Sequence, residues 1–296
     1  MKATILIGIS GAGKSTYIAQ NTHDQFGPSV ISKDNIRKSL IKNYDPSKNL
    51  WDQYFFKDNE ESINSLFDIQ LREAAKNKQN IIIDNTNLSK SKNERLERLL
   101  KNYGYVEIDY INFNLTDNIN FYLESNQNRI NTIPMRAIND QYLLAAQSGY
   151  IGLGMSTIAL VDIDGTVALH GKERSPFEYN KADKDLPNQY VIDTINALYE
   201  TKRIDYIQFL SGRESYSYEL TRNWLIKHGF DMNKHRLLMR RTGDHRKDAI
   251  VKQEIYETCL KQNAIKYLFD DRNQVVDMWW DNKLPVFHVG DYRNVF

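Results

Sequence analysis

The feature that most constrains this chain is a glycine-rich stretch near its start, Gly8 to Ser15, which reads G-I-S-G-A-G-K-S. Its spacing matches the pattern G-x-x-x-x-G-K-[ST], and it follows an apolar stretch and precedes a helical one, as a phosphate-binding loop requires. Glycines let backbone N–H groups turn inward around an anion at a helix N-terminus. The stretch therefore predicts a nucleotide site on a parallel sheet. The residues expected to bind ATP are Gly8, Gly11, Gly13, Lys14, Ser15 and Thr16.

Two of these residues carry further chemistry. Lys14 can reach the β- and γ-phosphates during transfer, and the Ser15 hydroxyl can ligate Mg²⁺. Arg129 and Arg136 lie in a polar segment late in the first half of the chain. Either is a candidate for a lid arginine that stabilises charge on the transferring phosphoryl group, and Arg129 is preferred.

The length of the chain suits two domains. Its 296 residues exceed one typical core and fit two domains of about 150 residues each. Strand-like and helix-like stretches alternate in the first half, as in a parallel sheet with crossover helices. Gly149, Gly152 and Gly154 then break the periodicity and indicate a hinge. We expect an α/β protein whose two domains span residues 1–150 and 151–296.

The apolar periodicity places the elements of each domain. In the first domain the expected strands are 2–9, 29–32, 80–83 and 106–113. One expected helix begins at Lys14, and three others span 33–42, 59–76 and 89–102. Polar residues 116–133 are expected to form a helix and a lid. In the second domain the expected strands are 157–163, 204–210, 236–239, 267–269 and 286–289.

Composition excludes several classes of protein. No apolar run approaches the roughly 20 residues of a membrane helix. A single cysteine, Cys259, excludes an intrachain disulfide and indicates a reducing compartment, so we expect a cytoplasmic protein. The net charge of +1 gives no global attraction for a polyanion, and any contact with nucleic acid must therefore be local.

Asp34 follows the second expected strand, where a side chain would lie beside the γ-phosphate. A carboxylate there can orient an attacking hydroxyl and accept its proton. Arg37 would share a helix face with Asp34 and could hold an acceptor phosphate. An alternative role for Asp34, as the N-cap of the helix, is compatible with the first.

A polar cluster ends the strand at residues 81–83. Asp84 is followed by Asn85, Thr86 and Asn87, at the carboxyl edge of the sheet where ligands bind in open α/β folds. These four residues could contact the acceptor or the nucleotide. The alternative is a turn in which Asn87 or Ser89 caps the next helix.

The second domain opens with an acidic motif. The apolar strand 158–161 leads into Asp162, Ile163, Asp164, Gly165 and Thr166. Carboxylates at i and i+2 on a strand point to one side and can hold Mg²⁺. Asp162 is expected to attack phosphorus as the nucleophile, and Asp164 to act as general acid and later as base.

Further motifs follow in the order of the haloacid-dehalogenase superfamily of phosphatases, which this half resembles. Ser211 ends one expected strand and would hydrogen-bond the phosphoryl oxygens. Asp270 and Asp271 end another and would ligate Mg²⁺. The resemblance also calls for a lysine, which Lys252 or Lys247 could supply, and Lys252 is preferred.

The two halves together resemble the bacteriophage polynucleotide 5′-kinase/3′-phosphatase family over nearly the whole chain. The stretches that carry the resemblance are 8–16, 33–37, 86–87, 162–166, 211–213, 243–248 and 270–272. The resemblance implies transfer of phosphate from ATP to a 5′-hydroxyl of DNA or RNA by the first domain and removal of a 3′-phosphate by the second. It implies that Arg174, Arg213 and Arg240 hold the 3′-phosphate-bearing strand and that Asp248 lies beside Lys252. It also implies a ligase that acts next and a homotetramer.

The chain departs from this family at Asn85, where an aspartate is expected, and at Ser125, where a second basic lid residue would be useful. These departures bear on acceptor preference and kinase rate. Two other functions are compatible with the motifs. One is a kinase and phosphatase of a small metabolite such as a nucleoside or sugar, because neither motif names its substrate. The other is a nucleotide-switched binding protein, which the converging acidic residues disfavour.

Overall fold

The computed structural model describes residues 1–22, 27–54, 60–114, 116–152, 154–170, 174–175 and 178–290. The chain divides into two compact units. The first contains residues 1–116, 121–134 and 144–152, and the second contains residues 117–120, 135–143 and 153–296. Each unit has its own parallel sheet, which confirms the expected two-part α/β fold.

The first unit is built on four strands with connecting helices. Its strands are β1 (Lys2–Ile7), β2 (Ser29–Ile31), β3 (Ile81–Asp84) and β4 (Glu107–Asn112). Its helices are α1 (Lys14–Asn21), α2 (Lys33–Leu40), α3 (Leu50–Gln53), α4 (Glu60–Lys76) and α5 (Lys90–Asn102). Two more helices, α6 (Ile119–Gln127) and α7 (Met135–Gln147), contribute residues to both units.

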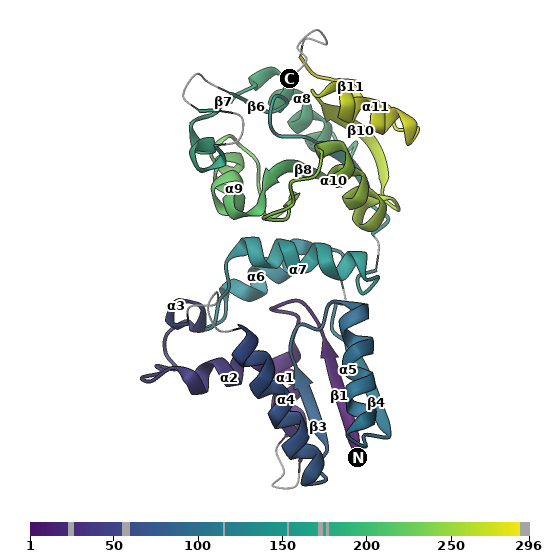
Figure 1. The fold of residues 1–296 in the computed structure, drawn as a ribbon. Coiled ribbons are helices and arrows are strands. Elements are labelled where there is room, and N and C mark those ends of the chain that lie inside the picture. The colour runs from purple at the N-terminus through teal and green to yellow at the C-terminus, as the bar shows by residue number, and fades with distance from the viewer. Residues whose placement is uncertain are drawn as a thin grey trace. The chain divides into compact units, whose positions relative to one another are not determined.

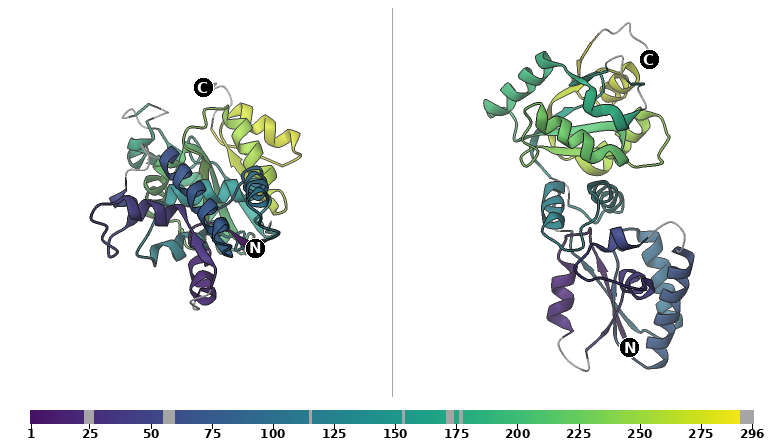
Figure 2. Two further views of the ribbon diagram at one scale, coloured as in Figure 1. Left: turned by 60° about the horizontal axis from the view of Figure 1, so that its bottom comes forward. Right: turned by 90° about the vertical axis from the view of Figure 1, so that its left-hand side faces the viewer.

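The strand order β2-β3-β1-β4 decides which helices cover which face of this sheet. All neighbouring strands are parallel, so each connection is a crossover. Because such crossovers are right-handed, α1 lies on one face, and α4 and α5 lie on the other. Figure 2 shows the sheet between these helices. The phosphate-binding loop follows β1 and Asp84 ends β3, and the register pairs Leu6 with Asp84, so both lie at the carboxyl edge of the sheet.

The core of the first unit explains why these segments fold in this way. The inward positions of β1 and β3, such as Ile5 and Ile83, pack with Ile63, Phe67 and Leu71 of α4. These three helix residues recur at a spacing of four, which is the apolar stripe of an amphipathic helix.

The second unit has five parallel strands. They are β5 (Thr157–Val161), β8 (Tyr206–Glu214), β9 (Arg236–Arg240), β10 (Ala264–Asp270) and β11 (Phe287–His288), and a separate antiparallel pair consists of β6 (Ala168–Leu169) and β7 (Leu186–Pro187). The helices are α8 (Gln189–Glu200), α9 (Tyr218–Lys227), α10 (Asp248–Ile255) and α11 (Asn273–Asp281), with the 3₁₀ turns η1 (Tyr179–Lys184) and η2 (Ser215–Ser217) and the π-helical turn η3 (Tyr256–Leu260).

The order of the sheet in this unit, β11-β10-β5-β8-β9, places β5 at its centre. Right-handed crossovers put α8 and α9 on one face and α10 and α11 on the other (Figure 1). The ends of β5, β8 and β10 therefore meet at one edge, and these strands carry the three motifs of the second half.

An asparagine side chain completes the edge strand β9. Asn139 of α7 is fully buried, its amide donates to the carbonyl oxygen of Met239 at 3.0 Å, and its Oδ1 accepts from the Met239 N–H at 3.0 Å. The pair of bonds copies the pattern of a neighbouring strand, so this part of the edge is covered. Helices α3 and α7 were not predicted from the sequence.

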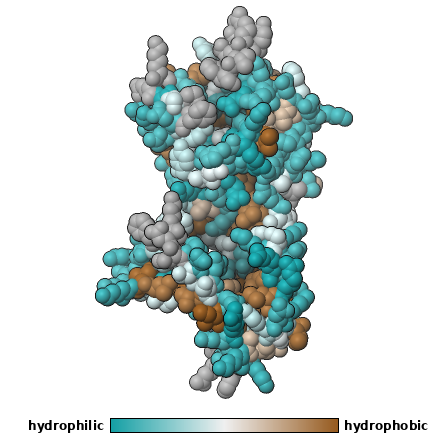
Figure 3. Space-filling view, viewed as in Figure 1, coloured by the Kyte–Doolittle hydropathy of each residue, from teal (hydrophilic) through white to brown (hydrophobic). Residues whose placement is uncertain are grey.

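In the view of Figure 3, hydrophobic side chains form several small clusters among hydrophilic ones. Among the residues that the structure describes, every helix is too short or too polar to traverse a lipid bilayer.

Candidate active sites of the two units

The phosphate-binding loop has the backbone form that its glycines predict. Gly13 stands at the N-cap of α1 in the left-handed region, with φ of 102°, and no side chain caps the helix. A residue with a Cβ is strained in that conformation. The first turn of α1 is therefore left to an external acceptor, as a helix N-terminus that binds phosphate requires.

Lys14 lies over this loop. Its Nζ donates to the carbonyl oxygens of Gly8 at 2.6 Å and Ile9 at 3.2 Å. Burial lowers the pKa of Lys14 to about 8, Asp84 and Asp34 oppose this shift, and the charge of Arg129 adds to it. The charges of Asp34, Asp84 and Arg129 thus all act on Lys14.

Asp34 is not the cap of its helix. Ser32 occupies the N-cap of α2, and its Oγ accepts from the Asp34 N–H at 3.2 Å. The alternative that made Asp34 the cap is thus wrong, because the cap is Ser32 and the helix begins two residues earlier than that alternative requires. The Asp34 carboxylate is 63% exposed and meets Nη1 of Arg37 at 2.7 Å. Arg37 also binds Glu60 of α4 at 2.7 Å, so it joins two helices as well as facing Asp34.

The residues after β3 form hydrogen bonds with the backbone of three other segments of the first unit. Asn85 Oδ1 accepts from the Lys33 N–H at 3.0 Å, and the Thr86 carbonyl accepts from the Gly8 N–H at 2.9 Å. Asn87, with φ of 48°, donates to the Leu6 carbonyl at 2.8 Å. These bonds tie α2 and the glycine loop to β3. Of the two predicted caps of α5, Ser89 occupies the N-cap position, but its side chain forms no cap bond.

In the second unit, a buried lysine joins two of the predicted acidic residues. Lys252 Nζ lies 2.6 Å from Asp162 Oδ1 and 2.9 Å from Asp270 Oδ2. Asp162, Asp270 and Asp271 each offer a carboxylate oxygen within 4.8 Å of the others. Sequence reasoning left Lys252 and Lys247 open, and the structure brings Lys252 into the cluster.

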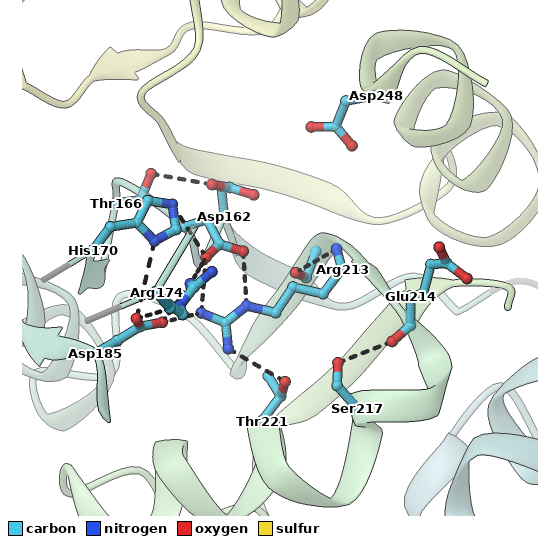
Figure 4. A network of polar contacts seen from close by, with 12 residues as sticks. Asp162, Thr166, His170, Arg174, Asp185, Arg213, Glu214, Ser217, Thr221 and Asp248 are labelled. Carbon is cyan, nitrogen blue, oxygen red and sulfur yellow. Dashed lines mark hydrogen bonds and ion pairs between the residues drawn. The ribbon is translucent and has the colours of Figure 1, made fainter. Parts of the chain in front are cut away.

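Asp164 does not join this cluster, contrary to expectation. Its carboxylate binds Arg213 at 2.7 Å and Arg174 at 2.7 Å, and His170 lies 3.6 Å away (Figure 4). Because β5 ends at Val161, Asp162 and Asp164 lie beyond the strand, where side chains at i and i+2 need not point to one side. Asp164 is thus corrected from a side-chain metal ligand beside Asp162 to a member of a separate polar network.

Arg174 and Arg213 belong to the same network and not to an open surface. The side chain of Arg213 is fully buried and that of Arg174 is 1% exposed, and both bind Asp185 as well as Asp164. In this structure both guanidinium groups are paired with Asp164 and Asp185, and their expected contact with a nucleic-acid strand stays a prediction. Asp185 was missed, because it lies among other charged residues and no local pattern distinguishes it.

Opposing influences set the pKa values of Asp162 and Asp164. Burial raises the pKa of Asp162 well above its usual value, with Asp270 and Asp271 adding to the shift and Lys252 opposing it. Burial alone would also raise the pKa of Asp164, but the charge and hydrogen bonds of Arg213, with His170 and Arg174, lower it overall. Asp164 is therefore held as an anion, whereas Asp162 lies in a region of excess negative charge.

Ser211 and Gly212 lie where β8 changes its register against β9. Ser211 is buried and its Oγ accepts from the Arg213 N–H at 3.1 Å. A Cβ at Gly212 would collide with the carboxylate of Asp248, which binds Arg240 at 3.0 Å and approaches Lys252 at 3.6 Å. The predicted proximity of Asp248 and Lys252 is confirmed, and glycine at position 212 makes room for it.

A cavity of about 270 Å³ opens above these residues. Its lining includes residues of the Asp162 and Lys252 cluster and of the Asp164 network. The lining residues are Asp162, Asp164, His170, Tyr179, Gly212, Glu214, Arg240, His245, Asp248, Lys252, Asp271 and Arg272. Cationic and anionic groups converge on one space that is large enough for a phosphoryl group, so this cavity is the candidate active site of the second unit.

These two sites define a class: a P-loop nucleotide-binding unit joined to a haloacid-dehalogenase-type unit. Residues 4–119 match the family model of an AAA domain, and residues 156–292 match that of the phosphatase domain of polynucleotide kinase PNKP. The first match falls almost entirely in the first unit and the second in the second unit, so each unit resembles one of these two families.

Relatives of the whole chain are also found. A putative bifunctional polynucleotide kinase/RNA ligase of Autographa californica nuclear polyhedrosis virus is 31% identical over 301 residues. The match covers 96% of this chain but 42% of that relative, so the chain spans less than half of its length. Two structures of a Pnkp1/Rnl/Hen1 complex, one of them described as an RNA repair complex, are 27% and 26% identical, with TM-scores of 0.41 and 0.43. Each match covers 98% of this chain and 97% of the matched chain in that structure.

Proposed function

We propose that this chain is an end-healing enzyme of nucleic acids. Its first unit transfers the γ-phosphate of ATP to a 5′-hydroxyl end of DNA or RNA, and its second unit removes a 3′-phosphate. One observation carries the proposal: the Asp162, Lys252 and Asp270 cluster lies in a domain that matches the phosphatase domain of a polynucleotide kinase. The same chain carries a complete phosphate-binding loop.

The phosphatase reaction takes place in two steps. The carboxylate of Asp162 attacks phosphorus, and the bond from phosphorus to O3′ breaks. The incoming phosphate dianion offsets the charge of Arg213 and Arg174 and raises the pKa of Asp164, so Asp164 takes up a proton when substrate binds and gives it to the leaving O3′. Water then attacks the phosphorus of the aspartyl-phosphate and gives its proton to Asp164, and the bond to Asp162 breaks to release phosphate. The lowered pKa of Asp164 favours this second step.

The donor set of the second unit fits Mg²⁺. Asp162, Asp270 and Asp271 supply three clustered carboxylates, which are the hard oxygen ligands that this ion prefers. Burial, and then the charge of Asp270, raise the pKa of Asp271 to about 6, while Lys252 and Arg272 oppose the shift. A bound Mg²⁺ would neutralise the charge of these carboxylates and that of the phosphoryl oxygens.

The first unit fits ATP. The uncapped start of α1 and the half-buried Lys14 together present donors and positive charge to a polyphosphate, and Ser15 would hold the Mg²⁺ that accompanies it. Asp34 accepts the proton of the attacking 5′-hydroxyl, and Arg129 stabilises the transferring phosphoryl group. Arg37 positions Asp34 through their 2.7 Å ion pair.

The partners follow from the chemistry and the resemblance. Ends that carry a 5′-phosphate and a 3′-hydroxyl are the substrates of a ligase. The name of the viral relative includes an RNA ligase. We therefore propose that a ligase acts next, on ends of DNA or RNA in a reducing, cytoplasmic compartment. The homotetramer and phage origin implied by the resemblance are part of the same proposal.

The deciding experiment uses γ-labelled ATP and an oligonucleotide with a 5′-hydroxyl and a 3′-phosphate. We expect label on the 5′ end and release of inorganic phosphate from the 3′ end, both requiring Mg²⁺. The matched control oligonucleotide carries a 5′-phosphate and a 3′-hydroxyl and should do neither. Nucleosides and sugars are tested in parallel, and transfer to these small molecules alone would refute the assignment.

A further inference from the structure

One tyrosine that lines the cavity of the second unit packs against a second tyrosine outside the lining, and the proposed chemistry uses neither. Tyr179 begins η1 and lines the cavity together with Asp162 and Lys252. Tyr216 lies in η2, directly after β8, and is 39% exposed. The two ring centroids are 6.2 Å apart with an interplanar angle of 47°. An aromatic surface therefore continues from the cavity to solvent.

The backbone holds Tyr216 firmly in place. Its neighbours Ser215 and Ser217 are buried, and Ser217 Oγ donates to the Glu214 carbonyl at 2.9 Å (Figure 4). Ser215 Oγ lies 3.0 Å from Oγ1 of Thr242. An exposed ring on an anchored turn loses little conformational entropy when it binds a flat ligand, because the turn already holds it in position.

The cavity also carries positive charge, which could hold the phosphate of a substrate whose base reaches the tyrosines. Arg240 and Arg272 line the cavity together with Tyr179, and the buried Nε of Arg240 has no hydrogen-bond partner among the described residues. A phosphate can therefore be held at one end of the cavity, while a planar group attached to it extends towards the tyrosines.

We propose that Tyr179 and Tyr216 form a subsite for the nucleobase of the terminal nucleotide that carries the 3′-phosphate. The inference rests on the proposed phosphatase function and adds a specificity element to it. Bases stack on aromatic side chains whatever their sequence, so the subsite recognises a nucleotide end without reading the base. It separates a nucleotide 3′-phosphate from a sugar phosphate of similar charge.

The test compares two oligonucleotides that differ only in the last residue. One ends in an ordinary 3′-phosphorylated nucleotide, and the other ends in a 3′-phosphorylated abasic analogue. For the natural chain, loss of the terminal base should lower kcat/KM by about 10-fold, mainly through KM, as expected for one stacked base. Tyr216→Ala and Tyr179→Leu should reduce this ratio towards one, and Tyr216→Phe should keep it.

Tyr190→Ala is the matched control, because Tyr190 is 88% exposed in α8 and does not line the cavity. It should leave the ratio between the two substrates as in the natural chain. Because each ratio is measured within one variant, partial misfolding cancels. Equal kcat/KM for both substrates in the natural chain, or an unchanged ratio in Tyr216→Ala, would overturn the subsite alone. Failure to hydrolyse either oligonucleotide would overturn the phosphatase function and the subsite with it.

Discussion

At the residue scale, Lys252 has the most demanding position in the second unit. Its ammonium group is buried and lies within 3.6 Å of Asp162, Asp248 and Asp270. Such a cation balances carboxylates that would otherwise repel one another in a low-dielectric environment. Asp270 also accepts a bond from Trp279 Nε1 at 3.2 Å, so the position of its carboxylate is fixed from two sides.

Lys252→Met should therefore abolish most phosphatase activity. We expect a loss of at least about 100-fold in kcat, as is typical when an electrostatic partner of the reacting group is removed. Breaking a buried ion pair also costs about 3–5 kcal/mol in the free energy of unfolding. Kinetics with the 3′-phosphate oligonucleotide and urea unfolding measure both effects.

Lys247→Met is the control for this change, because Lys247 is exposed at the N-cap of α10. It should retain nearly full phosphatase activity. A larger loss for Lys247→Met than for Lys252→Met would show that the wrong lysine has been assigned.

His235 gives a prediction about pH and stability. The ring is buried, its Nδ1 accepts from the Ile207 N–H at 3.3 Å, and burial lowers its pKa to about 4, with Asp231 opposing the shift and Lys234 adding to it. The unfolded chain takes up this proton below about pH 6.5, but the folded chain does so only near pH 4. Stability from this group is complete at neutral pH and is lost as the pH falls through that window.

His235→Asn keeps an acceptor for Ile207 but removes the titration. Between pH 7 and pH 5, the natural chain should lose about 2 kcal/mol more unfolding free energy than this variant. Urea unfolding at the two pH values, followed by tryptophan fluorescence, measures the difference. Equal losses in both proteins would mean that His235 does not remain neutral in the fold.

At the element scale, α2 carries Asp34 and Arg37 of the first site. Its start is fixed by the Ser32 cap, and its far side is tied to α4 through the ion pair of Arg37 with Glu60. Asn85 adds a third attachment by accepting from the Lys33 N–H. Three short polar links thus decide where the proposed base of the kinase lies.

Ser32→Ala should loosen the start of α2. Loss of the cap is expected to cost about 1 kcal/mol in the unfolding free energy of the first unit and to lower kinase activity, because Asp34 lies in the first turn. Ser89→Ala is the control, since Ser89 occupies the N-cap of α5 without a side-chain cap bond. Thermal unfolding and transfer of γ-phosphate are measured for both, and an equal loss in the control would contradict the role of the cap.

At the scale of the whole molecule, the two proposed sites use separate sheets, separate residues and separate cores. Asp162→Asn should abolish 3′-phosphatase activity, by at least about 1,000-fold, because it removes the nucleophile. It should leave the transfer of phosphate to the 5′ end intact. Lys14→Ala should have the reverse effect, and both activities are measured on one oligonucleotide. Loss of both activities in either variant would contradict two independent centres.

Much of this organisation was predictable from local patterns. The glycine loop, the alternation of strands and helices, and the acidic motifs at strand ends depend on residues close together in the chain, so backbone preferences and spacing determine them. Helices such as α3 and α7 were not predicted. Asn139 of α7 pairs with Met239 across a separation in sequence that no short pattern reveals.

The sequence by itself determined two parallel α/β units, a phosphate-binding loop in one and ordered phosphatase motifs in the other. Only the tertiary structure decided which side chains meet. Lys252 rather than Lys247 lies beside Asp162, Asp164 faces Arg213 and Arg174 rather than the other carboxylates, and Asp185 joins their network. The physical reason is that charge pairing within a buried cluster depends on how distant strands and loops pack, whereas spacing along the chain fixes only what a strand or loop can present at its end.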